Sequence, residues 1–311
     1  MSRRVLVTGG AGYLGRGILR QIAQGKLDWD VTVYSTDEEK QVKCHQRYPS
    51  ARYVLGDVRD LERLRTVMAG HEWVVHAAAI KYIPEAELNA AECIAVNIDG
   101  ARSVMAAARA CGVERVVGIS TDKAVMPVNV YGMTKAVMER LFQEEHQHAQ
   151  TPAFTCVRYG NVVGSTGSVI PLFRYQWQQE HKVRITDPNM TRFWMGVDEA
   201  IDVIQIALEK VHSGSIVIPP VRAATILDTA KAATCEDVEV EVIGTRPGEK
   251  KHELLLHHEE SVRAFKQKGY IELLPPGTPA IKEAFTIASH TPQYFIGIEE
   301  LRSLIDDAED V

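Results

Sequence analysis

The stretch RVLVTGGAGYLG, residues 4–15, decides the fold, because a β-branched run passes into three glycines spaced three residues apart. A helical run, GILRQIAQ at 17–24, follows directly. A Gly-x-x-Gly-x-x-Gly turn between a strand and a helix lets the backbone approach a pyrophosphate, and the helix N-terminus offers N–H donors. Alone the pattern indicates a tight turn, but at the first strand-to-helix turn of an alternating chain it predicts dinucleotide binding. The predicted cofactor-binding residues of this turn are Gly9, Gly12, Tyr13, Leu14 and Gly15.

Short β-branched runs and longer helical patterns alternate through the first half of the chain. The runs are nearly continuous in Val, Ile and Leu, as expected where helices cover both faces of a parallel sheet. The sequence therefore predicts an α/β fold with a Rossmann-like, doubly wound parallel sheet. The expected strands cover residues 4–8, 30–34, 52–56, 72–77, 115–120 and 154–158, and the expected helices cover residues 13–24, 61–69, 88–111, 131–149 and 198–212.

The second half of the chain has a different character. Beyond about residue 160, glycines and prolines break the rhythm into shorter elements. We expect residues 1–165 to form the dinucleotide-binding domain, which a return segment near 190–218 completes. Residues 166–311 are expected to form mainly a smaller, irregular substrate-binding lobe that shares one cleft with this domain.

Composition excludes several classes of protein. The 311 residues are 45% hydrophobic and 24% charged, which is ordinary for a folded chain. The net charge of −6 and the lack of a Lys/Arg-rich block give no footprint for nucleic acid or an anionic membrane. Five scattered cysteines without a C-x-x-C pair argue against a disulfide scaffold or a zinc site. Without a long apolar run, we expect a cytoplasmic protein that neither inserts into membranes nor holds a metal.

The end of the second strand bears on the choice of cofactor. A carboxylate that would hold the adenosine ribose of NAD is expected about 20 residues past the glycines, but Ser35 stands there. Loss of that negative charge favours the 2′-phosphate of NADP, with Ser35, Thr36 and Lys40 as donors. No arginine follows Ser35, so NAD stays open as the alternative.

Two further segments are expected to line the cofactor. Asp57 and Val58 end the third strand, where the carboxylate can accept a hydrogen bond from the adenine amino group or simply belong to a turn. After the fourth strand, a run of three alanines provides a floor without bulky side chains, although close packing alone also explains it. These alanines are Ala77, Ala78 and Ala79.

The catalytic candidates follow the fifth expected strand, which ends in the quartet STDK at 120–123. Tyr131 and Lys135 lie four residues apart at a helix start, so they share a face. An adjacent ammonium favours the phenolate, so Lys135 is expected to lower the pKa of Tyr131, which then acts as a base toward a substrate hydroxyl. Lys135 also reaches the nicotinamide ribose, and Thr121 hydrogen-bonds the same hydroxyl as Tyr131. The spacing alone also fits a solvated helix face.

Asp122 and Lys123 add a proton donor and a proton acceptor to the same loop. A dehydrogenase or a 4-epimerase needs only the tyrosine. An added acid and base suggest that a proton is removed and a hydroxyl expelled between two hydride steps, which is a dehydration. By charge pattern alone, the pair also fits an exposed ion pair after a strand.

Four blocks of sequence carry a resemblance to a known family. They are STDKAVMPVNVYGMTKAVMERLF (120–142), VRYGNVVGSTGSVIPLF (157–173), ITDPNMTRFWMGVDEA (185–200) and IGTRPGEKKHELL (243–255). With the glycine turn, they resemble the extended branch of the short-chain dehydrogenase/reductase superfamily. More narrowly, nearly the whole chain resembles the small C5-inverting UDP-N-acetylglucosamine 4,6-dehydratases that begin pseudaminic acid biosynthesis. Tyr131 favours this branch, because the larger membrane-anchored relatives tend to carry Met there.

The resemblance implies a lyase with a catalytic NADP. Tyr131 deprotonates the sugar O4 as the nicotinamide takes the C4 hydride, and the 4-ketone acidifies the C5 proton. Lys123 removes that proton, and Asp122 protonates the departing C6 hydroxyl. The hydride returns to C6 and a proton reaches C5 from the opposite face, which gives a 4-keto-6-deoxy sugar with inverted C5. Lys123 must be neutral to act as a base, and burial or a second ammonium, Lys81 or Lys135, is expected to lower its pKa.

The two phosphates of the substrate need partners, and no His/Cys/carboxylate cluster has metal-ligand spacing. Arg192 and Arg246 are the best candidates, because a guanidinium suits phosphate oxygens; a structural salt bridge is the alternative for Arg192. The resemblance adds Asn161 as a diphosphate contact, and Glu249 is expected to fix the loop of Arg246. Residues 81 and 82 are expected to face the sugar or, alternatively, to lie in a solvated loop. The predicted substrate-binding set is Lys81, Tyr82, Asn161, Arg192, Arg246 and Glu249.

Two other functions are compatible with the sequence. A nucleotide-sugar 4-epimerase needs Tyr131 and Lys135 but neither Asp122 nor Lys123. A redox-sensing protein keeps the NADP fold without turnover, but it has no use for the intact set of Thr121, Tyr131 and Lys135. Because extended-branch relatives assemble through their long helices, we expect at least a homodimer that acts on a UDP-sugar.

Overall fold

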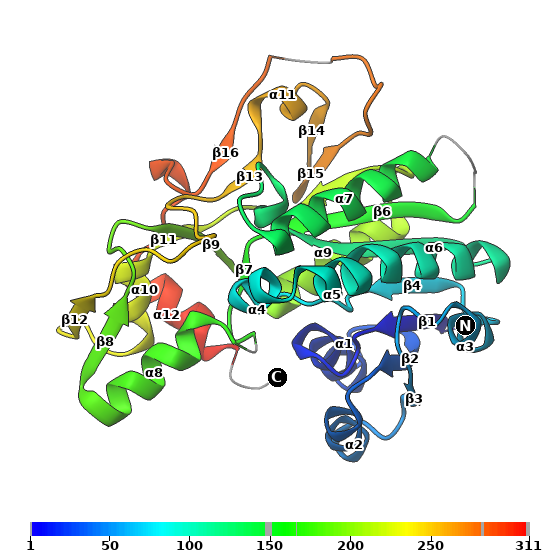
Figure 1. Cartoon of the computed structure of the whole chain (residues 1–311), viewed down its shortest axis with the longest axis horizontal. Helices are drawn as coiled ribbons and strands as arrows, with labels where there is room; N and C mark the ends of the chain where they lie inside the picture. Colours follow the sequence, from blue (N-terminus) through cyan, green and yellow to red (C-terminus); the bar gives the residue numbers. More distant parts are fainter. Residues whose placement is uncertain (1, 147–150, 166, 281–282, 309–311) are drawn as a thin grey trace.

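The computed structural model of the protein describes residues 2–146, 151–165, 167–280 and 283–308. Its centre is a mostly parallel sheet, which has nine strands within these residues (Figure 1). Seven neighbouring strands run parallel, and a hairpin joins one edge in antiparallel orientation. In spatial order the strands are β14 (Ala264–Gln267), β15 (Tyr270–Leu273), β10 (Ile216–Ile218), β6 (Ala153–Tyr159), β5 (Arg115–Thr121), β4 (Trp73–His76), β1 (Arg3–Thr8), β2 (Trp29–Ser35) and β3 (Arg52–Leu55).

Strand β1 lies in the middle of the sheet and pairs with β2 on one side and β4 on the other. Its Val5, Leu6 and Val7 are buried on both faces, as a β-branched central strand should be. The strand order reverses between β1 and β4, and ligands of open α/β sheets bind at the carboxyl ends of strands at such a point. This order confirms the predicted Rossmann-like, doubly wound fold.

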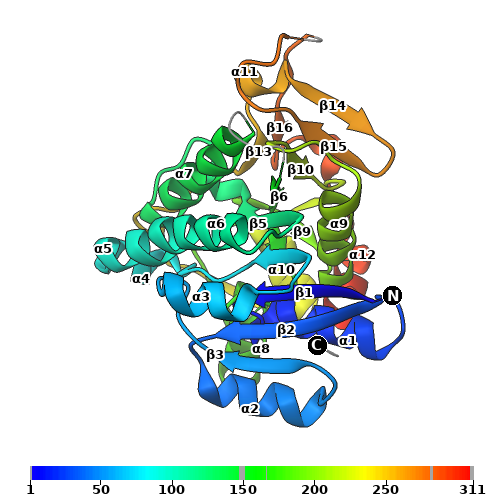
Figure 2. The ribbon, with the colours of Figure 1, turned by 90° about the vertical axis from the view of Figure 1, so that its right-hand side faces the viewer.

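Helices cover both faces of the sheet (Figure 2). One hydrophobic layer joins β1 and β2 to the helices that carry Ile18, Cys44 and Ile204, and the other joins the sheet to those that carry Leu64 and Phe142. The first layer holds α1 (Tyr13–Ala23), α2 (Glu38–Arg47) and α9 (Val197–Glu209), and the second holds α3 (Leu61–Met68), α4 (Ile83–Leu88), α5 (Ala90–Ile94), α6 (Gly100–Ala110) and α7 (Val130–Glu145).

Two helical regions differ from the sequence prediction. The helix expected over 88–111 is divided into several pieces. The first, α4, begins earlier, at Ile83, with Pro84 in its first turn. A π-helical turn, Ala95–Asp99, separates α5 from α6. Helix α2 was not expected. It buries only Gln41 and Cys44, so the hydrophobic period that reveals a helix is missing from its sequence.

The second half of the chain forms a smaller lobe, at the left of Figure 1, and also extends the sheet. Strand β10 belongs to the expected return segment near 190–218, while β14 and β15 lie beyond it, so the sheet takes in more of this half than expected. A third hydrophobic cluster around Phe173 and Trp194 fills the lobe. The remaining elements are β7 (Asn161–Val162), α8 (Val169–Glu180), β8 (Lys182–Ile185), β9 (Thr191–Met195), β11 (Ala223–Thr225), α10 (Ile226–Ala233), β12 (Glu239–Val242), β13 (Leu254–Leu256), α11 (His258–Ser261), β16 (Ile287–Ala288) and α12 (Ile298–Asp306), with the 3₁₀ turns η2 (Asp122–Ala124) and η3 (Pro292–Tyr294).

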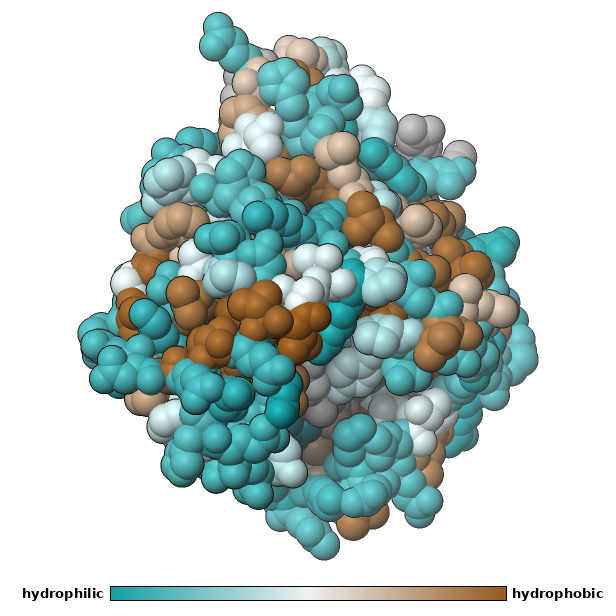
Figure 3. All heavy atoms as spheres, turned by 60° about the vertical axis from the view of Figure 1, so that its left-hand side comes forward, coloured by the Kyte–Doolittle hydropathy of each residue, from teal (hydrophilic) through white to brown (hydrophobic). Residues whose placement is uncertain are grey.

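The surface is mixed in character. In the space-filling view of Figure 3, hydrophilic side chains cover most of the face shown, and hydrophobic side chains gather near its centre. None of the helices in the described part of the chain has the length and apolar character needed to cross a membrane. The same residues contain no group of three His, Cys, Asp or Glu side chains placed to hold a metal ion.

Candidate active site

The glycine turn between β1 and α1 is shaped to receive a phosphate group. Gly9 has a positive φ of 66°, and a Cβ there would lie 2.8 Å from the Ala78 nitrogen. A Cβ at Gly15 would overlap the Gly10 carbonyl, so the helix and the turn must be this close. At Gly12, by contrast, an added Cβ would meet only the Gly9 oxygen, at 3.0 Å. No side chain caps the N-terminus of α1, which begins after Gly12. The backbone N–H groups in the first turn of α1 therefore face open space and can bind a pyrophosphate.

The neighbours of this turn hold it in place. The predicted floor, Ala77 to Ala79, follows β4, and the Ala78 N–H donates to Thr8 Oγ1 at 3.3 Å. The Tyr13 hydroxyl donates to the Ala308 carbonyl at 3.4 Å, while Leu14 packs against the core. Both side chains therefore face protein, and only their backbone N–H groups point to a role with a cofactor.

At the end of β2, the predicted phosphate donors differ in availability. Gln41 Nε2 donates to Ser35 Oγ at 3.0 Å, so the Ser35 hydroxyl keeps its own hydrogen for another acceptor. Thr36 is exposed. Lys40 forms an ion pair with Asp37, the N-cap of α2, so part of its charge is already compensated.

The predicted adenine contacts at the end of β3 are also engaged by the protein. Both oxygens of Asp57 accept hydrogen bonds from the Arg59 side chain, at 3.0 and 3.1 Å from Nε. These bonds lower the pKa of Asp57. Val58 is buried, and a Cβ at Gly100 would meet its Cγ2 at 2.7 Å. Arg59 was not foreseen as the partner of Asp57.

The carboxyl end of β5 carries Thr121, Asp122 and Lys123, which form a hydrogen-bonded group with the turn η2. Thr121 Oγ1 donates to Asp122 Oδ1 at 3.0 Å and accepts from the Lys123 N–H at 3.3 Å. Lys123 Nζ donates to the same Asp122 Oδ1 at 3.0 Å. Asp122 is completely buried, and its Oδ2 accepts no hydrogen bond from the described residues. The alternative of an exposed surface pair is therefore wrong.

The surroundings of Lys123 contradict the expected fall in its pKa. Nζ lies 3.4 Å from Asn161 Oδ1 and 3.9 Å from Glu253 Oε1. Burial lowers the pKa of Lys123, but the negative charges of Asp122 and Glu253 outweigh it, so the pKa is raised. The cation that opposes them is Arg192 rather than the expected Lys81 or Lys135. The raised pKa favours the ammonium form of Lys123.

Tyr131 lies in the first turn of α7, which Asn129 caps by accepting from the Gly132 N–H at 2.7 Å. Burial raises the pKa of Tyr131 to about 12, while the positive charge of Lys123 and a hydrogen bond with Thr121 oppose the rise. The cation that acts on this phenol is therefore Lys123, and not Lys135 as the spacing predicts.

Lys135 is buried one turn further along α7. Its Nζ donates to the Ile119 carbonyl at 2.7 Å, and burial lowers its pKa to about 8. The negative charge of Glu139 opposes this shift only in part. Lys135 thus lies next to the carboxyl end of β5, on the side of α7 that faces the protein.

Asn97, which sequence reasoning missed, joins the cofactor floor to α7. Its Oδ1 accepts from the Ile80 N–H at 2.8 Å, and its Nδ2 donates to the Ile80 carbonyl at 2.9 Å and to Thr134 Oγ1 at 2.9 Å. Thr134 in turn donates to the Tyr131 carbonyl at 2.8 Å. In the sequence, Asn97 is one asparagine inside an expected helix and does not indicate these contacts. The π-helical turn brings its side chain to Ile80 and Thr134.

The predicted substrate residues fall into separate places. Arg192 is buried, donates to the Thr191 carbonyl at 2.8 Å, and forms no ion pair with a carboxylate of the described residues. Its guanidinium therefore keeps a positive charge for an anion, and no carboxylate in the described part of the chain forms the salt bridge that was the alternative. Arg246 is exposed, and Glu249 accepts from its N–H at 3.3 Å, which fixes this loop. None of the described contacts links the Arg246 side chain to the group around Lys123.

Three other residues of this set lie nearer the sheet. Asn161, expected at the diphosphate, contacts Lys123 from β7. Lys81 and Tyr82 are exposed in the loop after β4, with Nζ of the lysine 5.8 Å from the centre of the tyrosine ring. The tyrosine ring packs on Gly167, so the loop meets the segment that follows β7.

Comparison with known proteins places the chain among enzymes of sugar nucleotides. Residues 5–274 match the family described as polysaccharide biosynthesis protein. The chain is 37% identical over 278 residues to an inverting UDP-N-acetylglucosamine 4,6-dehydratase of Campylobacter jejuni, which covers 88% of this chain and 83% of that protein. It is 34% identical to a UDP-glucose 4-epimerase of Rickettsia felis, over 99% of this chain and 90% of the other.

Solved structures agree. The X-ray structure of Pen from Bacillus thuringiensis is 33% identical, with a TM-score of 0.91 over 100% of this chain and 98% of that one. A dTDP-glucose 4,6-dehydratase from Streptomyces venezuelae, 22% identical, has a TM-score of 0.72 over 79% of this chain and 86% of its own, and this likeness concerns the fold alone. The chain therefore belongs to the polysaccharide biosynthesis protein family, within the short-chain dehydrogenase/reductase fold that its motifs predict, and is similar over most of its length to the inverting UDP-N-acetylglucosamine 4,6-dehydratases.

Proposed function

We propose that the protein dehydrates UDP-N-acetylglucosamine to a UDP-4-keto-6-deoxy-N-acetylhexosamine with inversion at C5. The observation that carries this proposal is the 3.0 Å contact between the buried Asp122 and Lys123, whose side chain is only 16% exposed and whose charge acts on Tyr131. Burying two charges is expensive, and an enzyme that only moves a hydride at C4 has no use for them. Similarity to the Campylobacter jejuni dehydratase supports the same reaction.

The first step needs a base at O4 of the sugar. The nicotinamide cofactor supplies a reversible hydride acceptor when bound. Tyr131 takes the O4 proton, and Thr121 orients the same hydroxyl. Because the pKa of Tyr131 is about 12 in the ligand-free site, the nearby Lys123 ammonium is needed to stabilise the phenolate. Lys135 holds the nicotinamide ribose in this scheme.

The second step needs a neutral amine and an acid, whereas the raised pKa of Lys123 favours its ammonium form. Transfer of one proton along the 3.0 Å contact from Lys123 to Asp122 produces both required forms at once. The amine then takes the C5 proton, and the carboxylic acid protonates the leaving C6 hydroxyl. A bound sugar that displaces water from the pair favours this neutral form, because burial disfavours separated charges. Return of the hydride to C6 and of a proton to C5 completes a lyase reaction.

For the cofactor we propose NADP, with NAD as the alternative. The glycine turn and the alanine floor fit the pyrophosphate and the nicotinamide half of either. Support for NADP comes from Ser35 in place of a carboxylate and from its hydroxyl, which retains a hydrogen to donate. Thr36 and Lys40 complete the 2′-phosphate site, with Lys40 leaving Asp37 to reach it.

For the substrate diphosphate we propose Arg192 and Arg246, with Asn161 as a further contact. Arg192 is the stronger candidate, because a buried guanidinium without a carboxylate partner among the described residues suits an anion. Arg246 joins it from the exposed loop that Glu249 fixes. Lys81 and Tyr82 would border the sugar from the loop after β4.

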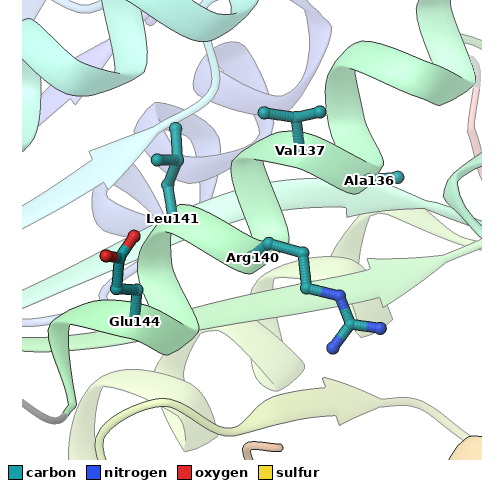
Figure 4. A pocket seen from close by; sticks show the side chains of 5 residues that line it. All are labelled: Ala136, Val137, Arg140, Leu141 and Glu144. Atoms are coloured by element: carbon teal, nitrogen blue, oxygen red, sulfur yellow. The ribbon is translucent and has the colours of Figure 1, made fainter.

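We propose that the protein acts as a homodimer or larger oligomer in the cytoplasm, in the synthesis of pseudaminic acid or a related glycan sugar. Support for assembly comes from the outer face of α7, where Met133 and Val137 are exposed. A shallow hollow of about 260 Å³ lies on this face, and Figure 4 shows the side chains that line it. Its lining residues are Ala136, Val137, Arg140, Leu141 and Glu144, all from one helix. In this proposal, residues 1–165 with the return segment bind NADP and residues 166–311 bind mainly the sugar nucleotide.

A nucleotide-sugar 4-epimerase is the second candidate. The Rickettsia felis relative named as a UDP-glucose 4-epimerase is 34% identical over 99% of this chain, and Tyr131 with Lys135 would suffice for epimerisation. A sensor that binds NADP without turnover is disfavoured by the complete set of Thr121, Tyr131 and Lys135.

Variants of the buried pair distinguish these reactions. Asp122→Asn should still oxidise C4, seen as the near-ultraviolet absorbance of reduced nicotinamide, whereas Lys123→Met should also slow this step, because it removes the charge that stabilises the Tyr131 phenolate. Neither variant should form the 4-keto-6-deoxy product. Product formation at the wild-type rate by both variants would contradict a dehydration through this pair.

A further inference from the structure

Glu253 brings a second carboxylate from the C-terminal lobe to the catalytic lysine. It is buried, and its Oε1 lies 3.9 Å from Lys123 Nζ. Its Oε2 lies 3.4 Å from Lys250 Nζ and accepts no hydrogen bond from the described residues. Burial raises the pKa of this carboxyl, while the Lys123 charge opposes the rise. A buried carboxylate is costly, so its place beside Lys123 calls for a role.

The backbone of Glu253 is fixed on both sides. Its N–H donates to Ser289 Oγ at 2.9 Å, and its carbonyl accepts from the Ser289 N–H at 2.9 Å. The next residue, Leu254, begins β13 and pairs with Ala288 of β16 (Figure 1). The carboxylate is therefore held at a defined position and does not swing on a free loop.

Lys250 connects this carboxylate to the loop that follows the catalytic pair. Its Nζ donates to the Val125 carbonyl at 2.6 Å and forms the ion pair with Glu253. The segment 250–253 is thus attached both to the loop after Lys123 and to the lysine itself.

The geometry around Lys123 leaves one task that Asp122 does not perform. Asp122 is the preceding residue in the chain, so its single contact with Nζ restricts the flexible lysine side chain only partly. Asn161 at 3.4 Å and Glu253 at 3.9 Å approach Nζ from other segments and restrict it further. Of these two, only Glu253 carries a charge that attracts the ammonium.

We propose that Glu253 is a positioning residue for the elimination step, which holds the Lys123 amine at C5 of the sugar while Asp122 serves the C6 hydroxyl. This inference rests on the proposed dehydration. None of the described contacts joins Glu253 to Tyr131, and Asp122 still pairs with the Lys123 ammonium when Glu253 is replaced, so oxidation at C4 should keep its rate.

The test compares the two half-reactions in Glu253→Gln, with UDP-N-acetylglucosamine in D2O. Reduced nicotinamide should appear at the wild-type rate and then persist. Incorporation of deuterium at C5 and product formation should slow by about a hundredfold, as expected when a reacting group is misplaced by about an ångström. Glu259→Gln, a matched change at a side chain that is 86% exposed, should behave like the wild type.

A merely structural role predicts a different pattern. Equal slowing of C4 oxidation and C5 exchange, or no slowing of either, would overturn the positioning role. Glu253→Asp keeps the charge and should restore part of the elimination rate. If the Gln variant does not fold, the Asp variant is judged by the same ratio of the two steps. A wild-type enzyme that leaves the substrate unchanged would refute the proposed function before any variant is compared.

Discussion

Burial and contacts with other segments decide the charges of the catalytic side chains together with their neighbours in sequence. Lys135 and Tyr131 are four residues apart, yet burial lowers the pKa of the lysine to about 8 and raises that of the tyrosine to about 12. Lys123 keeps a raised pKa because Asp122 and Glu253 outweigh its burial. A Y-x-x-x-K spacing cannot reveal these directions, because they depend on depth and on a carboxylate from another segment.

Ser35 offers a test of the cofactor at a single residue. Ser35→Asp adds a carboxylate at the end of β2, which repels a 2′-phosphate and can accept hydrogen bonds from ribose hydroxyls. We expect the preference for NADP over NAD to fall by about tenfold or more, which corresponds to about 1.4 kcal/mol. Binding constants for both cofactors check this. Ser50→Asp, in the exposed turn before β3, is the control, and an unchanged preference in Ser35→Asp would contradict the proposed phosphate site.

His76 predicts a pH dependence of stability. The side chain is completely buried at the end of β4, hydrogen-bonded to Thr8 Oγ1 at 2.8 Å, and burial lowers its pKa to about 3. His76 binds a proton near pH 6.5 in the unfolded chain but stays neutral in the folded chain at that pH. The free energy of unfolding therefore decreases as the pH falls below 6.5. From pH 6.5 to 5 this costs about 2 kcal/mol.

Denaturant unfolding at the two pH values measures this cost. His76→Gln should lose about 2 kcal/mol less than the wild type over the same interval, because glutamine does not titrate. Identical losses in the two proteins would show that His76 does not resist protonation in the fold.

At the scale of elements, hydrophobic periodicity accounts for what could be predicted. The strands β1, β4, β5 and β6 were expected within a residue or two of their observed bounds, because their short apolar runs are buried on both faces. Helix α2 was missed because it is polar. The break between α5 and α6 was missed because Asn97 bonds to Ile80 and Thr134, which lie far from it in sequence.

The start of α7 gives a prediction at this scale. Asn129 caps the helix through Oδ1 and donates from Nδ2 to the Gly248 carbonyl at 2.8 Å, so it joins the helix to the lobe. Asn129→Ala should lower the free energy of unfolding by about 1 to 2 kcal/mol. Asn89→Ala is the control, because Asn89 precedes α5 without a side-chain cap and is exposed. Equal stability of the two variants would contradict this role.

At the scale of the whole molecule, the site is assembled from segments that the sequence keeps apart. The residues of the predicted catalytic set come from one stretch, 121–135, and could be found by their spacing. Glu253 and Asn161 reach Lys123 from the second half of the chain. Their place depends on how the lobe folds back on the sheet, and no local pattern encodes that contact.

At this scale we predict that the protein forms a homodimer or a larger oligomer. The exposed Met133 and Val137 on α7 favour burial against a second copy, so light scattering should give at least twice the mass of one chain. Val137→Arg should shift the particle toward the monomer, whereas Val42→Arg, at an exposed position of α2, should not. A wild-type mass equal to one chain would contradict the proposed oligomer.

The most direct measurement of the central claim is incubation of the wild-type protein with UDP-N-acetylglucosamine in D2O, followed by mass spectrometry and proton NMR. The account predicts the loss of one water and a new C6 methyl signal without splitting, because C5 carries deuterium. The ring couplings should show the inverted configuration at C5. Unchanged mass with exchange of configuration at C4 would contradict the dehydration and identify an epimerase instead.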